Sequence, residues 1–92
     1  MDIQIHPTPN PNSIKITAAD RRFIDGGMES FATAEDAVGH ALGERLFAIT
    51  GVGNVFILPD FLTITRHPAA EWDAILPKIE RVLKSYFASA AD

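Results

Sequence analysis

The chain has 92 residues, of which 47% are hydrophobic, so its length and composition suit one domain with a modest core. Its formal net charge is −4 and it carries no basic stripe, which disfavours nucleic acid as a partner. The absence of cysteine excludes disulfides, thiolate nucleophiles and cysteine ligation of zinc or iron–sulfur clusters.

The sequence also predicts where the protein works. No apolar run approaches the roughly eighteen residues expected of a membrane span. The first ten residues, MDIQIHPTPN, lack the basic and apolar regions of a signal peptide. We therefore expect a single cytoplasmic domain over residues 1–92, with no membrane contact.

Two short strands flank a proline-rich segment near the N-terminus. Ile3 and Ile5 alternate with polar residues, and residues 13–17 alternate in the same way. Residues 7–12 (PTPNPN) contain three prolines, which cannot donate ladder hydrogen bonds and disfavour an α conformation in the residue before each. The pattern predicts a stiff, extended loop between paired strands.

The next part of the chain is less regular. Residues 25–27 (DGG) indicate a turn, and residues 30–32 can form a short strand. Thr33 is a favourable N-cap for a following helix, with Asp36 three residues later as in a capping box. The apolar face of this helix is predicted to comprise Ala34, Ala37, Val38, Ala41 and Leu42. Gly39 and Gly43 weaken a helix interior by about 1 kcal/mol each, so we expect a break that leaves two short helical pieces.

A helix–strand–turn–strand unit follows over residues 42–66. Gly51 is suited to a left-handed helix exit, and residues 52–58 are rich in β-branched and aromatic side chains. Pro59 and Asp60 suit the centre of a tight turn, and residues 61–65 alternate like a half-buried strand.

The last predicted helix carries one broad apolar stripe at spacings of three and four. Its members are Trp72, Ile75, Leu76, Ile79, Val82, Leu83 and Tyr86 or Phe87. Pro77 should interrupt and kink this helix, because it lacks an N–H group. The element order β-β-(β)-α-β-β-α predicts an α+β fold of two layers, a mainly antiparallel sheet of four or so strands with two helices on one face.

No residue pattern predicts a catalytic or metal site. His6, His40 and His67 share no metal-ligand spacing, and solvated or capping roles explain them better, with His67 placed to cap a helix start. No serine lies in a nucleophile elbow, and residues 51–53 (GVG) leave a helix rather than open one, unlike a dinucleotide loop. Asp60 with Arg66 or Arg45 nearby is best explained as a surface ion pair.

The segment 7–12 has two interpretations. It can be a rigid connector in which Asn10 and Asn12 make Asx turns, or a recognition loop whose stiffness lowers the entropy lost on binding. Lys15 and Arg45 would then be polar anchors beside it. Phe47, Phe56 and Phe61 cannot all point inward if their neighbours do, and an aromatic ring left outside would mark a contact patch.

Three segments together carry a resemblance to a known family. They are PTPNPNSIKI at 7–16, RLFAITGVGNVFILPDFLTIT at 45–65, and Trp72 with the later Leu76-Pro77. In this order and spacing they resemble the N-terminal domain of the Nfu/NifU-type iron–sulfur scaffold proteins. The resemblance implies a role in iron–sulfur cluster assembly or delivery. In full-length members the cluster is held by a Cys-x-x-Cys motif in a separate C-terminal domain, so we expect a stand-alone accessory domain without cofactor or metal.

The favoured function is therefore a non-enzymatic adaptor that binds iron–sulfur assembly proteins or apo-client proteins. The alternatives are a small ligand-binding or regulatory domain that shares the fold only, a metal-binding protein using histidine and carboxylate ligands, and an enzyme with a site at a homodimer interface. The candidate partner-binding residues are Pro7, Thr8, Pro9, Asn10, Pro11, Asn12, Lys15, Arg45 and Asp60.

Overall fold

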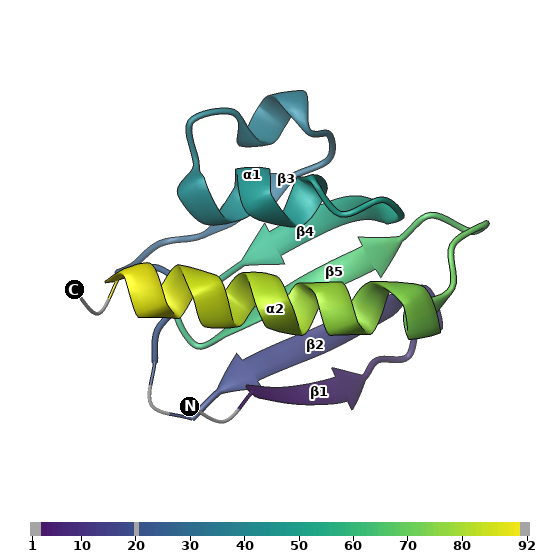
Figure 1. Ribbon diagram of the computed structural model, residues 1–92, viewed down its shortest axis with the longest axis horizontal. Helices are drawn as coiled ribbons and strands as arrows, with labels where there is room; N and C mark the ends of the chain where they lie inside the picture. The colour runs from purple at the N-terminus through teal and green to yellow at the C-terminus, as the bar shows by residue number, and fades with distance from the viewer. Residues whose placement is uncertain (1–2, 20, 91–92) are drawn as a thin grey trace.

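The computed structural model describes residues 3–19 and 21–90, which form one antiparallel sheet and two α-helices (Figure 1). The five strands lie in the order β1-β2-β5-β4-β3. Their bounds are β1 Ile3–Pro7, β2 Ser13–Ala18, β3 Glu29–Phe31, β4 Val52–Ile57 and β5 Phe61–Arg66. The helices are α1 Ala41–Phe47 and α2 Trp72–Ala90, and a single 3-10 turn, η1, spans Glu35–Ala37.

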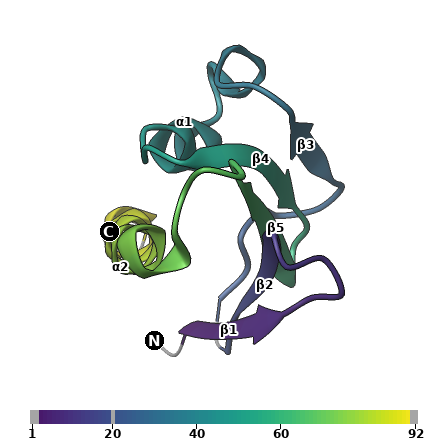
Figure 2. The same ribbon diagram turned by 90° about the vertical axis from the view of Figure 1, so that its right-hand side faces the viewer.

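Both α-helices lie on the same side of the sheet, which curves around α2 (Figure 2). This arrangement confirms the predicted two-layer α+β fold and its element order. The sheet has five strands because the short segment at residues 29–31 pairs with β4. None of the described helices is long and apolar enough to cross a membrane.

The core lies between the sheet and the helices. Alternate residues of the three central strands are fully buried, among them Ile16 on β2, Val55 on β4 and Leu62 on β5. Ile79 and Leu83 of α2 meet them from the other layer. Because side chains of a strand alternate between its two faces, the same register leaves the intervening residues on the side without helices.

The predicted first helix is broken, as expected, but it starts later. Thr33 Oγ1 accepts from Asp36 N at 3.2 Å, but only the short turn η1 follows, and its N-cap is Ala34, without a side-chain cap hydrogen bond. Gly39 then adopts a φ of 93°, and α1 starts after His40, whose Nδ1 accepts from Gly43 N at 3.0 Å. His40 is thus the histidine that caps a helix, where the sequence favoured His67.

Two further expectations for the helices were wrong. Val38, predicted on the apolar face of the first helix, is 75% exposed because it follows η1 in an extended conformation. Pro77 does not interrupt the last helix, since α2 continues through it from Trp72 to Ala90.

Gly51 joins the helical layer to β4, and its backbone adopts the predicted left-handed conformation with a φ of 105°. A Cβ at this position would lie 2.9 Å from Ala70 Cβ and 3.0 Å from Ile75 Cδ1. The connection therefore needs both the conformational freedom and the small size of glycine.

We expect Gly51→Ala to lower the free energy of unfolding by about 1–3 kcal/mol, through a strained φ and a steric clash with Ala70. Urea denaturation measures the change. The control is Gly26→Ala, because a Cβ on Gly26 would meet no heavy atom within 4 Å and the φ of this residue is not positive. Equal stabilities for the two variants would contradict this role of Gly51.

Candidate protein-interaction surfaces

The side of the sheet that faces away from the helices is uncovered by any described element (Figure 2). We call it the outer sheet face. Cross-strand pairing places His6, Lys15, Thr63, Phe56 and Ser30 in one row across it. The full set is Gln4, His6, Ser13, Lys15, Thr17, Ser30, Asn54, Phe56, Phe61, Thr63 and Thr65.

Two aromatic rings stand on the outer sheet face. Phe56 lies opposite Thr63, two residues along β5 from Phe61, so the two rings are diagonal neighbours about 7–8 Å apart at their backbones. Both are only half-buried. Lys15 Nζ lies 4.7 Å from the centroid of the Phe61 ring, a cation–π contact. The sequence had raised the possibility of an outward aromatic ring, and the structure places these two outside.

The outer sheet face has a different charge from the protein as a whole. Glu29 is the one acidic residue within the five described strands, and it pairs with Ile57, whose side chain is on the helix side. The outer side of the strands therefore carries Lys15 and His6 without a carboxylate, although the chain has a net charge of −4. A neutral or acidic partner surface would suit it.

Side-chain hydrogen bonds hold the polar part of this face in place. Ser13 Oγ and Thr65 Oγ1 are 2.7 Å apart on neighbouring strands, and His6 Nε2 lies 3.1 Å from Thr17 Oγ1. Because these groups are paired across strands, the surface is ordered before any partner binds, which lowers the entropy cost of binding.

The segment 7–12, which we call the proline–asparagine loop, lies at one end of the sheet and is held by its own hydrogen bonds. Asn10 Oδ1 accepts from Asn12 N at 2.9 Å, which is the predicted Asx turn at Asn10. Thr8 Oγ1 donates to Asn10 O at 2.8 Å. Asn12 instead uses its carbonyl oxygen, which accepts from Arg66 N at 2.8 Å. The loop is thus a built part of the fold, and its role in binding stays a prediction.

Arg66 and Trp72 connect this loop to the start of α2. Trp72 Nε1 donates to Pro11 O at 3.2 Å, and the Arg66 guanidinium lies 6.0 Å from the Trp72 ring centroid. Arg66 also donates to the carbonyl oxygens of Pro68 and Ala70. The expectation that Arg66 lies near Asp60 was therefore wrong, because its side chain organises the connection between β5 and α2.

The remaining candidate residues lie on separate surfaces. Lys15 is on the outer sheet face, whereas Arg45 is on α1 in the helical layer, 5.8 Å from the Tyr86 ring centroid. Asp60 follows β4 at the end of the sheet opposite the proline–asparagine loop. Lys15 and Arg45 cannot be anchors beside one loop, since the sheet separates them.

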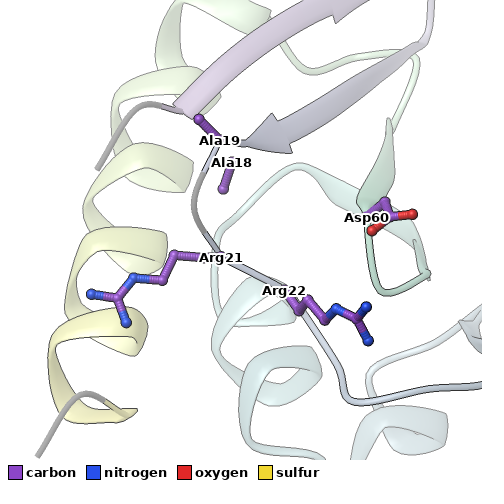
Figure 3. A pocket seen from close by; sticks show the side chains of 5 residues that line it. All are labelled: Ala18, Ala19, Arg21, Arg22 and Asp60. Carbon is purple, nitrogen blue, oxygen red and sulfur yellow. The ribbon is translucent and has the colours of Figure 1, made fainter.

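Asp60 lines a surface depression of about 490 Å³ with Ala18, Ala19, Arg21 and Arg22 (Figure 3). The arginines near Asp60 are thus Arg21 and Arg22, and Arg45 was also wrongly expected there.

The segment that holds Arg21 and Arg22 is fixed to the core by Phe23. The backbone N of Phe23 donates to Pro59 O at 3.0 Å, and its ring is buried against Phe87. The two arginine side chains extend in opposite directions and do not converge on one point (Figure 3). In the sequence, the adjacent Arg21 and Arg22 are the only feature that could have indicated this surface.

The described residues contain no group of three or more histidine, aspartate or glutamate side chains that could hold a metal ion. What the geometry offers is a set of solvent-facing surfaces with different chemistry.

Comparison with known proteins identifies the family. The family model for the N-terminal domain of the scaffold protein Nfu/NifU matches residues 3–90. This chain belongs to the Nfu/NifU N-terminal family. The match confirms the resemblance found in the sequence, and it covers nearly the whole chain.

Individual relatives of this Nfu/NifU N-terminal domain agree with that result. The mitochondrial NFU1 iron–sulfur cluster scaffold homologue of Drosophila ananassae is 37% identical over 89 residues, which are 97% of this chain and 31% of the relative. The solution structure of a NifU-like protein from Saccharomyces cerevisiae has a TM-score of 0.82 at 26% identity, over 96% of this chain and 79% of that one. Protein SAV1430 from Staphylococcus aureus has a TM-score of 0.72 at 28% identity, over 90% and 99%. The chain thus spans about a third of the length of the Drosophila relative.

We expect Thr65→Val to lower the free energy of unfolding by about 1–3 kcal/mol, because it leaves the buried Ser13 hydroxyl without its partner. Thr63→Val, on the same strand and the same face, is the control and should change stability by less than about 0.5 kcal/mol. Thermal and urea unfolding measure both. A control as destabilised as Thr65→Val would show that the hydroxyl pair does not order this face.

Proposed function

We propose that this Nfu/NifU N-terminal domain is a non-catalytic adaptor in iron–sulfur cluster assembly or delivery and acts by binding other proteins. Family membership supports the pathway, since the matching family is described as the N-terminal part of scaffold proteins. The partners would be iron–sulfur assembly proteins or apo-client proteins. A cytoplasmic location stays a prediction from the sequence, because the Drosophila relative is described as mitochondrial.

One observation carries the proposed binding mode: the outer sheet face presents Phe56 and Phe61 without a covering element. Aromatic side chains supply much of the binding energy at protein interfaces, because they bury a large area with few rotatable bonds. Lys15 beside Phe61 adds a positive charge that can orient an acidic or neutral partner. Thr17, opposite Phe61, and Thr63, opposite Phe56, are half-buried and add hydroxyl groups beside the rings.

The composition of the chain agrees with an adaptor role. Its 92 residues include no cysteine, so thiolate ligation of a cluster by this chain is excluded. We propose that it contributes recognition, by bringing a protein that carries a cluster and a protein that receives one into contact.

The alternative is a small ligand-binding or regulatory domain. The depression at Asp60 is the feature that bears on it, because Arg21 and Arg22 line it together with that carboxylate. Ligand sites normally have a few polar groups that converge on the ligand, and here the two arginine side chains diverge (Figure 3). The outer sheet face therefore supports the adaptor better than the depression supports a ligand site.

The test is anaerobic affinity capture of the tagged protein from its own cell extract, followed by mass spectrometry. We expect cluster carriers or apo iron–sulfur proteins to be enriched. Lys15→Glu and Phe61→Ser should each reduce their recovery at least ten-fold, because the first reverses the charge of the face and the second removes a ring. Lys84→Glu, an equal charge change on α2 in the other layer, is the control.

Circular dichroism and thermal unfolding establish that each variant is folded. If folded Lys15→Glu and Phe61→Ser proteins recover the same iron–sulfur proteins as the original chain, the outer sheet face is not the binding surface. Recovery of no iron–sulfur protein by the original chain, even after crosslinking at low salt, would contradict the pathway itself.

A further inference from the structure

A second surface of different chemistry lies in the helical layer, on the side of the molecule away from the outer sheet face. It is a groove of about 350 Å³ between α1 and α2, which we call the helical groove. Its lining residues are Arg45 and Ala48 from the end of α1, and Arg81, Val82 and Ser85 from α2. Figure 1 shows the two helices that form its walls, with α1 beside the C-terminal half of α2.

The helical groove combines an apolar floor with two positive walls. Ala48 and the half-buried Val82 supply the floor, and the exposed Arg45 and Arg81 stand on opposite helices. The Arg45 guanidinium lies 5.8 Å from the Tyr86 ring centroid, which holds it over the α2 side of the groove. This contact orders the Arg45 wall of the groove.

Among the residues that the structure describes, no carboxylate lines the helical groove, although twelve of the 92 residues are acidic. Glu44 and Glu80 each directly precede one of the two arginines in the sequence. Adjacent residues of a helix do not face each other, however, because they are about 100° apart around its axis. Glu80 is therefore placed away from the groove, whereas Glu44, four residues before Ala48, is placed beside its α1 edge without lining it.

We propose that the helical groove binds an acidic amphipathic helix of a partner protein. The apolar side chains of that helix would pack on Ala48 and Val82, and its carboxylates would pair with Arg45 and Arg81. Charge complementarity favours this occupant, since the net charge of the chain is −4 while the lining of the groove carries two arginines and no acidic residue. Helices with apolar residues at i, i+3, i+4 and i+7 recurrently bind in such grooves.

Other occupants fit the helical groove less well. A small anion would use the arginines but would leave the apolar floor exposed to water. An anionic membrane surface is broad and would meet Glu44 and Glu80 on the flanks of the groove as well as the arginines. A helix that lies along the groove instead places its carboxylates next to Arg45 and Arg81 and covers Ala48 and Val82 with its apolar side chains.

This inference goes beyond the proposed adaptor function, because it adds a second binding surface on the opposite side of the sheet from Phe56 and Phe61. Two partners bound on opposite sides would not compete for space. The domain could then hold an acidic partner helix in the helical groove while the outer sheet face contacts another protein.

The probe for this site is a synthetic helical peptide with leucine at i, i+3, i+4 and i+7 and glutamate at the flanking positions. Its counterpart has every glutamate replaced by lysine. Fluorescence anisotropy measures binding to the full chain at low and at physiological salt, and backbone amide chemical shifts locate it. We expect the acidic peptide to bind at least ten-fold more tightly than the basic one, more weakly as salt rises, with the largest shifts at Ala48, Val82 and Ser85.

Arg45→Glu and Arg81→Glu should each weaken binding of the acidic peptide at least five-fold. Arg22→Glu, the same charge change in the loop beside Asp60, is the matched control and should leave binding unchanged. Arg81→Gln serves if a charge reversal disturbs folding, which thermal unfolding reports. Phe61→Ser should also leave peptide binding unchanged. This variant therefore separates a test of binding at the helical groove from a test of binding at the outer sheet face.

Three results would overturn the proposal. The acidic and basic peptides could bind equally, or the shifted amides could lie outside the helical groove. In the third result, the protein binds vesicles of phosphatidylserine and phosphatidylcholine, this binding is lost in Arg81→Glu, and the acidic peptide does not bind. That result would assign the groove to a membrane surface.

Discussion

The structure depends on the burial of one face of a five-stranded sheet against two helices. The aliphatic residues of β2, β4 and β5 all point to this side, where each fully buried Leu, Ile or Val contributes roughly 1.5–3 kcal/mol. Two helices are enough to cover one face and leave nothing for the other. The uncovered aromatic rings of Phe56 and Phe61 are a direct consequence, because the residues next to them must point inward.

A second constraint fixes how the layers meet. Arg66 leaves β5 on the helix side, binds the carbonyl oxygens of the following turn and stacks near Trp72, which in turn donates to Pro11. The proline–asparagine loop is therefore tied to the start of α2 as well as to β5. These contacts give the proline-rich loop a structural role, so its composition does not by itself require a binding role.

Much of this fold could be predicted from the sequence because it follows from local patterns. The alternation in residues 13–17 and 61–65, the turn at Pro59 and Asp60, and the break near Gly39 all appear in the structure. The sequence-based predictions were wrong where the position of a residue depends on tertiary packing. Periodicity does not show that Lys15 and Arg45 lie in different layers, and the irregular segment around Arg21 and Arg22 carries no pattern that could place it beside Asp60.

The candidate surfaces were harder to predict than the fold for the same reason. An outward aromatic ring was expected, but which rings lie outside depends on strand register, which the β-bulge between Val52 and Asn54 alters. The helical groove needs the spacing of two helices that are far apart in the sequence. Arg81 and Ser85, which line it, follow the polar pattern of an ordinary exposed helix face.

The most direct test of the central claim is to map the contact surface of a complex between this domain and an iron–sulfur protein recovered with it. Cross-saturation measured by NMR reports which side chains of the domain touch the bound protein. If the outer sheet face is the recognition surface, saturation should concentrate on Phe56, Phe61 and Thr63 and spare the outer flank of α2. Saturation that spares these three residues, in a complex that is demonstrably formed, would contradict the account.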